Sequence, residues 1–169
     1  AALDSAAVTP VPASAVVAPA TPTMAEPPTR TPQPELAATA SPQPITLSSP
    51  SFAADAEIPV HFVCPTYGGD EISPALTWGD IPAGTKSLAL TMLDPDAGQY
   101  VHWLVANIPV ETTGFDEGQV PAAAAVGWTT NGTTRYLGPC PEATHHYVFT
   151  LYALDTETDL EPGFGWIDF

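Results

Sequence analysis

The chain has 169 residues and carries 19 acidic against 3 basic side chains, which gives a formal net charge of −16 at pH 7. This charge disfavours binding to nucleic acid or to an anionic membrane, because like charges repel. The length fits one domain with an extension, and no apolar run is long enough for a transmembrane helix.

The first 50 residues differ in composition from the rest of the chain. They contain 11 of the 21 prolines and no aromatic residue, and Ala, Thr and Ser make up most of the remainder. Such a segment has too few large apolar side chains to offset the entropy lost on folding. We therefore expect residues 1–50 to be a disordered, partly polyproline linker or tether, and residues 51–169 to form one domain.

Tails rich in Ala, Pro and Thr are typical of tethers that hold exported domains at a cell surface. This composition favours a periplasmic, extracellular or surface-tethered location, with a cytoplasmic location as the alternative. Cys64 and Cys140 are compatible with one disulfide in an exported protein, and equally with two buried thiols.

Four apolar segments predict the main strands of the domain: 58–63, 87–93, 102–108 and 147–154. Turn signals rich in Gly and Pro separate them, and residues 122–125 could form a short helical turn. Closely spaced strands without long helices predict a mainly β fold, a β-sandwich of antiparallel or mixed sheets. The expected core aromatic residues are Trp78, Trp103, Phe149 and Tyr152.

Two polar clusters precede apolar strands, and together they hold three of the four histidines. The first is Asp94-Pro95-Asp96 followed by His102-Trp103, and the second is Gly138-Pro139-Cys140-Pro141 followed by His145-His146-Tyr147. Backbone amides in such turns, together with imidazoles at strand ends, can form a pocket for a small anion. The alternative is that both clusters are simple turns and rigid connectors.

Asn131-Gly132-Thr133 fits a glycosylation sequon, and we interpret it as a turn.

If the second cluster lies on a strand, its side chains point in different directions. Sequential side chains on a strand point to opposite faces, so at most one of His145 and His146 can face a given pocket. Tyr147 shares a face with His145 and could add a hydroxyl donor.

These motifs, in this order, resemble the phosphatidylethanolamine-binding protein (PEBP) family in its bacterial and archaeal branch, which is related to Raf kinase inhibitor protein. The resemblance runs from about Phe52 to about Gly163. It implies a PEBP-like β-sandwich with Greek-key-type sheets, few short helices and a small anion pocket. The pocket would bind phosphate-type groups, including phospholipid headgroups such as that of phosphatidylethanolamine, without catalysis, cofactor or metal.

The resemblance also implies roles for individual residues. The ligand-binding set is Asp94, His102, Gly138, Pro139, His145 and Tyr147, with Asp96 and Trp103 in support. In the expected mechanism both imidazoles, backbone amides and the Tyr147 hydroxyl donate hydrogen bonds to phosphate oxygens, while Asp94 holds His102 in its donor tautomer. From residue 51 onward, sixteen acidic residues stand against Lys86 and Arg135, so we expect a zwitterionic headgroup to bind better than free phosphate.

The chain departs from the family pattern at several positions. Gly98 and Glu142 stand where prolines are usual, His146 stands where an arginine is usual, and the family's C-terminal segment is missing from residues 51–169. An inhibitor of a kinase or protease that uses the pocket rim is an alternative function. A metal-dependent hydrolase is disfavoured, because two sequential histidines on a strand are poorly placed to bind one metal. The sequence leaves the oligomeric state open.

Overall fold

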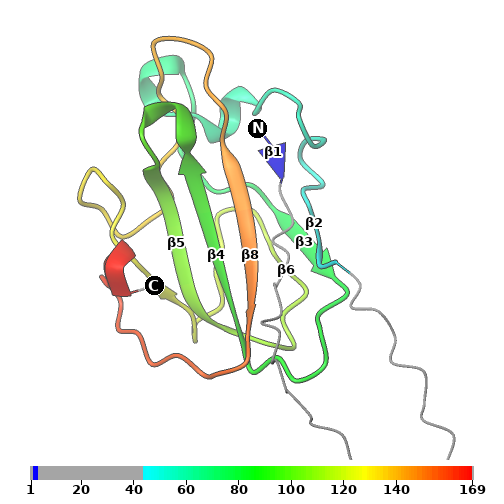
Figure 1. The fold of residues 1–169 in the computed structure, drawn as a ribbon. Coiled ribbons are helices and arrows are strands. Elements are labelled where there is room, and N and C mark those ends of the chain that lie inside the picture. Colours follow the sequence, from blue (N-terminus) through cyan, green and yellow to red (C-terminus); the bar gives the residue numbers. More distant parts are fainter. Residues whose placement is uncertain (1, 4–43, 169) are drawn as a thin grey trace, which may run out of the picture. The chain divides into compact units, whose positions relative to one another are not determined.

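The computed structural model describes residues 2–3 and 44–168, which form two β-sheets packed face to face (Figure 1). The larger sheet has the strand order β1-β8-β4-β5-β7 and the smaller sheet the order β2-β3-β6. The strands are β1 (Ala2–Leu3), β2 (Thr46–Ser48), β3 (Leu76–Gly79), β4 (Ser87–Asp94), β5 (Tyr100–Pro109), β6 (Gly114–Phe115), β7 (Ala125–Val126) and β8 (Val148–Leu154). Four 3-10 helical turns connect them: η1 (Val60–Phe62), η2 (Pro65–Tyr67), η3 (Pro95–Ala97) and η4 (Trp166–Asp168).

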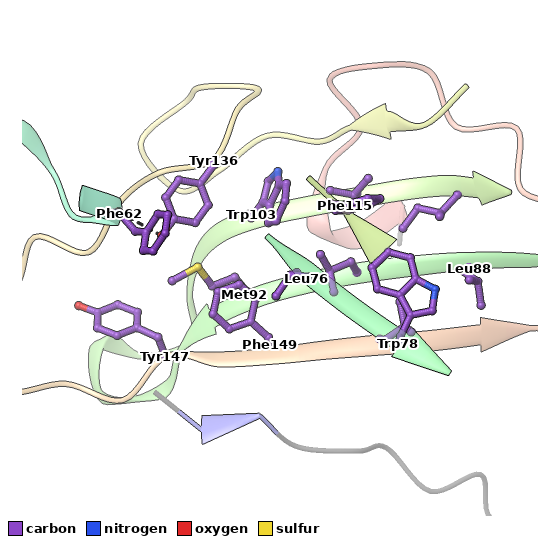
Figure 2. Close-up of a cluster of buried hydrophobic side chains, with 14 of the residues drawn as sticks. Phe62, Leu76, Trp78, Leu88, Met92, Trp103, Phe115, Tyr136, Tyr147 and Phe149 are labelled. Atoms are coloured by element: carbon purple, nitrogen blue, oxygen red, sulfur yellow. Dashed lines mark hydrogen bonds between the residues drawn. The ribbon is translucent and has the colours of Figure 1, made fainter. Parts of the chain in front are cut away.

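The three long strands β8, β4 and β5 form the centre of the larger sheet and pair antiparallel. Residues of β4 are buried on both faces, which explains why its sequence is a nearly continuous apolar run rather than an alternating one. On the inner face Met92 pairs with Trp103 of β5 and Phe149 of β8, and Trp78 packs against Phe115 of the second sheet (Figure 2). This cluster is the main core between the two sheets.

The outer face of the larger sheet has a second, smaller apolar cluster. Leu104 and Ala106 of β5 lie there with Phe164 from the segment that follows β8. The sheet is therefore covered on both faces. A mainly β sandwich with few short helices, as expected from the sequence, is confirmed.

The three strongest strand predictions are confirmed as β4, β5 and β8, and the strand expected at 58–63 is wrong. Its central residues form η1, because Pro59 fixes φ near −56° before the turn and the amide of Phe62 donates to the Pro59 carbonyl at 2.9 Å. Ile58 and Phe62 are buried, but Val60 between them is 60% exposed, so the apparent alternation does not describe one face of a strand.

Smaller differences follow from local geometry. The segment expected to be a helical turn at 122–125 instead contains a turn closed by the Ala124 amide and the Pro121 carbonyl, and its last residue already belongs to β7. Tyr152 is half-buried and lines a groove on the outer face, while Trp78, Trp103 and Phe149 are in the core as expected. Strands β1 and β2 lie within the range expected to be linker, and the rest of that linker lies outside the described residues.

A disulfide joins Cys64 to Cys140, one of the two alternatives that the sequence leaves open. It links the segment containing η1 and η2 to the segment that precedes β8. The two cysteines are 76 residues apart, so the bond closes a long loop in the unfolded chain.

We expect the double variant Cys64→Ser, Cys140→Ser to lose about 2–4 kcal/mol of unfolding free energy, because the unfolded chain regains loop entropy. Urea unfolding of the wild type and the variant measures this loss. Reducing agent should lower the wild-type midpoint and leave the variant unchanged. Equal midpoints for the oxidised wild type and the variant would contradict the expectation.

Candidate functional site

A pocket of about 480 Å³ opens at one end of the larger sheet, a size that suits a small ligand. β4 ends there at Asp94, and β5 and β8 begin there, because β4 runs antiparallel to both neighbours. The lining includes five of the six predicted ligand-binding residues, Asp94, His102, Gly138, His145 and Tyr147. It also includes residues that the sequence analysis did not assign to a site, among them Glu71, Tyr100 and Asn131.

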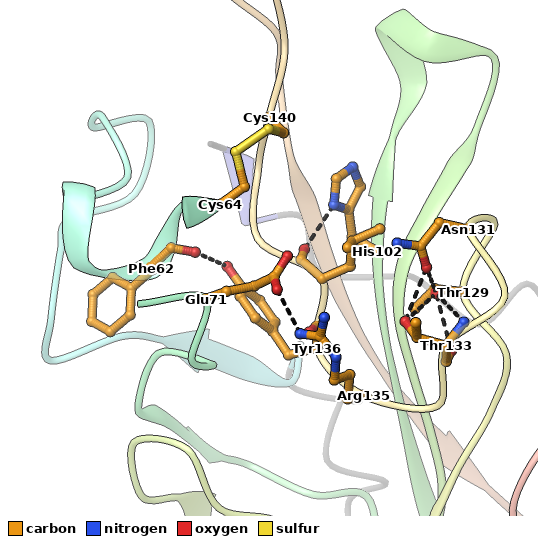
Figure 3. Close-up of polar contacts among 11 residues, drawn as sticks. Phe62, Cys64, Glu71, His102, Thr129, Asn131, Thr133, Arg135, Tyr136 and Cys140 are labelled. Carbon is orange, nitrogen blue, oxygen red and sulfur yellow. Dashed lines mark hydrogen bonds and ion pairs between the residues drawn. A yellow bond between two sulfur atoms is a disulfide. The ribbon is translucent and has the colours of Figure 1, made fainter. Parts of the chain in front are cut away.

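His102 lies near the start of β5 and is 5% exposed. Its Nδ1 is 2.8 Å from the carbonyl oxygen of Leu137 (Figure 3). A carbonyl only accepts, so Nδ1 carries the proton, and Nε2 holds a lone pair when the ring is neutral. Burial lowers the pKa of His102 below 6.5, although the bond to Leu137 and the charge of Asp94 oppose this shift. At neutral pH, His102 therefore presents an acceptor to the pocket.

Asp94 holds His145 rather than His102, which corrects the expected pairing. One oxygen of the buried Asp94 carboxylate lies 2.7 Å from His145 Nδ1, and the other accepts the amide of Ala97 at 3.0 Å. The imidazole therefore donates Nδ1–H to the carboxylate, and Nε2 becomes a donor only when the ring is protonated. His102 is fixed instead by Leu137, whose amide also donates to the His102 carbonyl.

Tyr147 packs edge-on against His102, with the ring centres 5.1 Å apart. Burial raises the pKa of Tyr147 above its usual value of 10.0, and the charge of Asp94 raises it further, so the hydroxyl keeps its proton. Within the described residues this hydroxyl has no hydrogen-bond partner. It is therefore available as a donor in the pocket.

The wall formed by Gly138 lies directly against the chain at residues 62–64. The Cys64 amide donates to the Pro139 carbonyl at 3.0 Å, and the Cys64–Cys140 disulfide lies beside this contact. Gly138 lines the pocket, whereas Pro139 is buried and does not line it. Of the two predicted wall residues, only Gly138 faces the ligand space.

The predicted supporting residues lie outside the pocket. Trp103 is in the core, where it packs edge-on against Tyr136. Asp96 accepts hydrogen bonds from both the backbone amide and Nδ1 of His146, and neither residue lines the pocket. His145 and His146 thus face different environments, as expected, although both precede β8 instead of lying in it.

The charges around the pocket are mostly negative. Asp94 and Glu71 line it, and Arg135 neutralises Glu71 through a 2.7 Å ion pair (Figure 3). None of the described residues that line the pocket is Lys or Arg. Among the described residues, no group of three or more His, Cys, Asp or Glu side chains is arranged to hold a metal ion. In the same part of the chain no helix could span a membrane.

Sequence reasoning missed Glu71 and Asn131 for different reasons. Glu71 is brought to the pocket by η1 and η2, which the sequence did not predict. Asn131 belongs to an Asn-Gly turn signal, which predicts local backbone shape and not the pocket that the turn borders.

A family model described as "Phosphatidylethanolamine-binding protein" matches residues 48–167. A UPF0098 protein of Methanothermobacter thermautotrophicus is 43% identical over 125 residues, which cover 69% of this chain and 81% of the relative. A Mycobacterium tuberculosis protein named as a lipoprotein, LppC, is 45% identical over 126 residues, 72% of this chain and 61% of LppC. The crystal structure of Escherichia coli YbcL, described as a new member of the mammalian PEBP family, has a TM-score of 0.67 and 30% identity, covering 72% of this chain and 83% of YbcL.

We expect Gly138→Ala to destabilise the protein by about 1–3 kcal/mol, the usual cost of overpacking. The new Cβ would lie 2.7 Å from the Val63 carbonyl carbon and 2.8 Å from the Cys64 nitrogen, backbone atoms that cannot rotate away. Gly165→Ala is the matched control, because its nearest neighbour is the Asp168 carboxylate at 3.4 Å. Urea unfolding measures both, and equal midpoints would show that the wall is not tightly packed.

Proposed function

Because the chain belongs to the phosphatidylethanolamine-binding protein family, we propose that it is a non-enzymatic binding protein whose pocket takes a small molecule bearing a phosphate group, such as a phospholipid headgroup. The observation that carries the proposal is the convergence of His102, His145 and Tyr147 on one cavity. In each of them a polar atom, the Nε2 of either imidazole or the Tyr147 hydroxyl, has no partner within the described residues.

Hydrogen-bond direction sets how a phosphate group would bind. In both imidazoles Nδ1–H already donates to a protein group, the Leu137 carbonyl for His102 and the Asp94 carboxylate for His145. Each neutral ring therefore offers the ligand only an acceptor, at Nε2. A phosphate oxygen also accepts, and contact with either ring requires a proton on that ring or on the ligand. Both imidazoles therefore donate only when protonated, which refines the mechanism expected from the sequence. Tyr147 donates without this condition.

The contacts of these groups support recognition rather than turnover. A nucleophile of the serine or cysteine type needs a general base within hydrogen-bond reach. Each imidazole keeps an Nε2 lone pair that could act as a base, but no serine is among the described residues that line the pocket, and both cysteines that line it are in the disulfide. The described residues contain no group of three or more His, Cys, Asp or Glu arranged to hold a metal ion, so they give no support to the alternative of a metal-dependent hydrolase.

Two further parts of the proposal concern partners and location. Inhibition of a kinase or protease through the pocket rim stays a prediction that the described contacts do not address.

An exported or surface-tethered location is supported by the disulfide, since such bonds persist in oxidising compartments, and by the lipoprotein name of LppC.

Adjacent histidines allow a matched test of the binding site. We expect His145→Asn to weaken binding of O-phosphoethanolamine roughly ten- to hundredfold, the loss of one charge-assisted hydrogen bond. His146→Asn should change it less than about twofold by the same scale, because His146 lies outside the pocket. Isothermal titration calorimetry measures both.

The ligands in this titration distinguish the source of the phosphate. O-phosphoethanolamine, inorganic phosphate, ethanolamine and phosphatidylethanolamine vesicles are compared at low salt. Tighter binding of the zwitterion than of inorganic phosphate is expected from the acidic surface. Equal losses in the two asparagine variants, or no binding of any phosphate ligand, would contradict the proposal.

Binding should strengthen as the pH falls from about 8 to 6, because the complex holds protons that the separate molecules lack. The contribution of His102 to the stability of the unliganded protein has the opposite pH dependence. Burial lowers the pKa of His102 relative to the unfolded value of 6.5, so the unfolded state takes up this proton first and the His102 contribution to stability falls as the pH drops below 6.5.

Calorimetry in two buffers of different ionisation enthalpy measures the number of protons taken up. Glycerophosphoethanolamine is the control ligand, because its phosphodiester does not titrate in this range and uptake must then occur on the protein. Proton release on binding, or affinity for both ligands that is constant with pH, would rule out imidazole protonation as part of recognition.

A further inference from the structure

The turn at residues 129–133 lies beside the pocket because it is attached to the start of β5. The Val101 amide donates to Thr130 Oγ1 at 2.8 Å, and the Thr130 amide donates to the Val101 carbonyl at 3.1 Å. Val101 precedes His102, so these bonds bring Asn131 to the cavity, which it lines. The position of Asn131 is therefore fixed by the same strand that carries His102.

Hydrogen bonds orient the side-chain amide of Asn131. Asn131 Oδ1 lies 2.7 Å from the Thr129 hydroxyl and 2.9 Å from the Thr133 hydroxyl, and either hydroxyl can donate to it (Figure 3). The single hydrogen of the Thr129 hydroxyl can also reach the Thr133 carbonyl at 3.0 Å. Thr129 is itself buried, and its hydroxyl oxygen accepts a hydrogen bond from the Thr133 amide. With Oδ1 facing the two hydroxyls, the Nδ2 hydrogens are left without a partner within the described residues.

We propose that Asn131 is a ligand-binding residue, whose Nδ2 donates a hydrogen bond to an anionic oxygen of the bound molecule. The inference rests on the proposed phosphate-binding function and adds a residue that the family motifs in this sequence do not include. Asn131 is always a donor, whereas each imidazole donates only after it is protonated. The titratable groups that line the same cavity are Glu71, Asp94, Tyr100, His102, His145 and Tyr147.

The backbone of the turn does not require asparagine for this purpose. Gly132 adopts the left-handed region at φ 79°, but Asn131 does not have a positive φ. Aspartate could accept the same two hydroxyl bonds and keep the turn. An asparagine therefore differs from an aspartate here mainly in what it presents to the cavity, an N–H donor instead of a second carboxylate oxygen.

This difference gives a sharp experiment with O-phosphoethanolamine as the probe, measured by calorimetry at pH 8, where fewer imidazoles are protonated. Asn131→Asp should weaken binding at least tenfold, because a donor is replaced by a repelling charge. Asn131→Ala should weaken it roughly two- to tenfold, the loss of one neutral hydrogen bond.

Thr134→Asp is the charge-matched control, since Thr134 is exposed on the same loop and does not line the pocket. It should change the affinity less than about twofold. NMR adds a direct observation, because the chain has two asparagines and the side-chain NH2 signal that disappears in Asn131→Asp identifies Asn131. That signal should shift as the probe is added.

The outcomes separate this inference from the function on which it rests. Wild-type binding with no loss in either Asn131 variant, or an NH2 signal that does not move, overturns the role of Asn131 and leaves the proposed function standing. An equal loss in Thr134→Asp and Asn131→Asp overturns it as well, because net charge alone would explain the effect. Absence of wild-type binding overturns both, and unchanged urea midpoints show that the variants are folded.

Discussion

The buried carboxylate of Asp94 is the constraint on which the pocket depends. One oxygen accepts a hydrogen bond from the Ala97 amide and caps η3, the turn that leads from β4 into β5. The other accepts a hydrogen bond from Nδ1–H of His145, which precedes β8. A buried carboxylate needs such donors, because leaving it unpaired away from water is costly. A single side chain therefore joins three strand ends and fixes the direction of one imidazole, so the fold and the site share one interaction.

The hydrogen bonds within the protein also determine which donors and acceptors remain free for a ligand in the pocket. Leu137 uses the Nδ1–H of His102 just as Asp94 uses that of His145, so both neutral rings present lone pairs. A pocket with these acceptors and two carboxylates favours ligands that bring protons or positive charge. Under the proposed function, a protonated phosphate, or a headgroup that also carries an ammonium group, is therefore expected to bind better than a bare dianion.

The sequence predicts the parts of this structure that depend on local pattern. Continuous apolar runs identify β4, β5 and β8. The expectation that only one of His145 and His146 faces the pocket is confirmed, although both residues precede β8 instead of lying in it. The sequence cannot identify partners that only the fold brings together. Asp94 and His102 are eight residues apart and suggest a pair, yet the actual partner of Asp94 is 51 residues away, on the far side of β4. The segment at 58–63 fails as a strand because Pro59 dictates a turn that outweighs its β-branched residues.

Position 146, where the family pattern usually has an arginine, lies outside the pocket in this structure. His146 pairs with Asp96 outside the cavity, and Arg135, the guanidinium nearest in the chain, is engaged with Glu71. No permanent positive charge therefore lines the described pocket. In the proposed function, attraction for an anion would therefore come from neutral donors such as the Tyr147 hydroxyl and from protons acquired on binding, so recognition would depend on pH in a way that a permanent positive charge in the pocket would not.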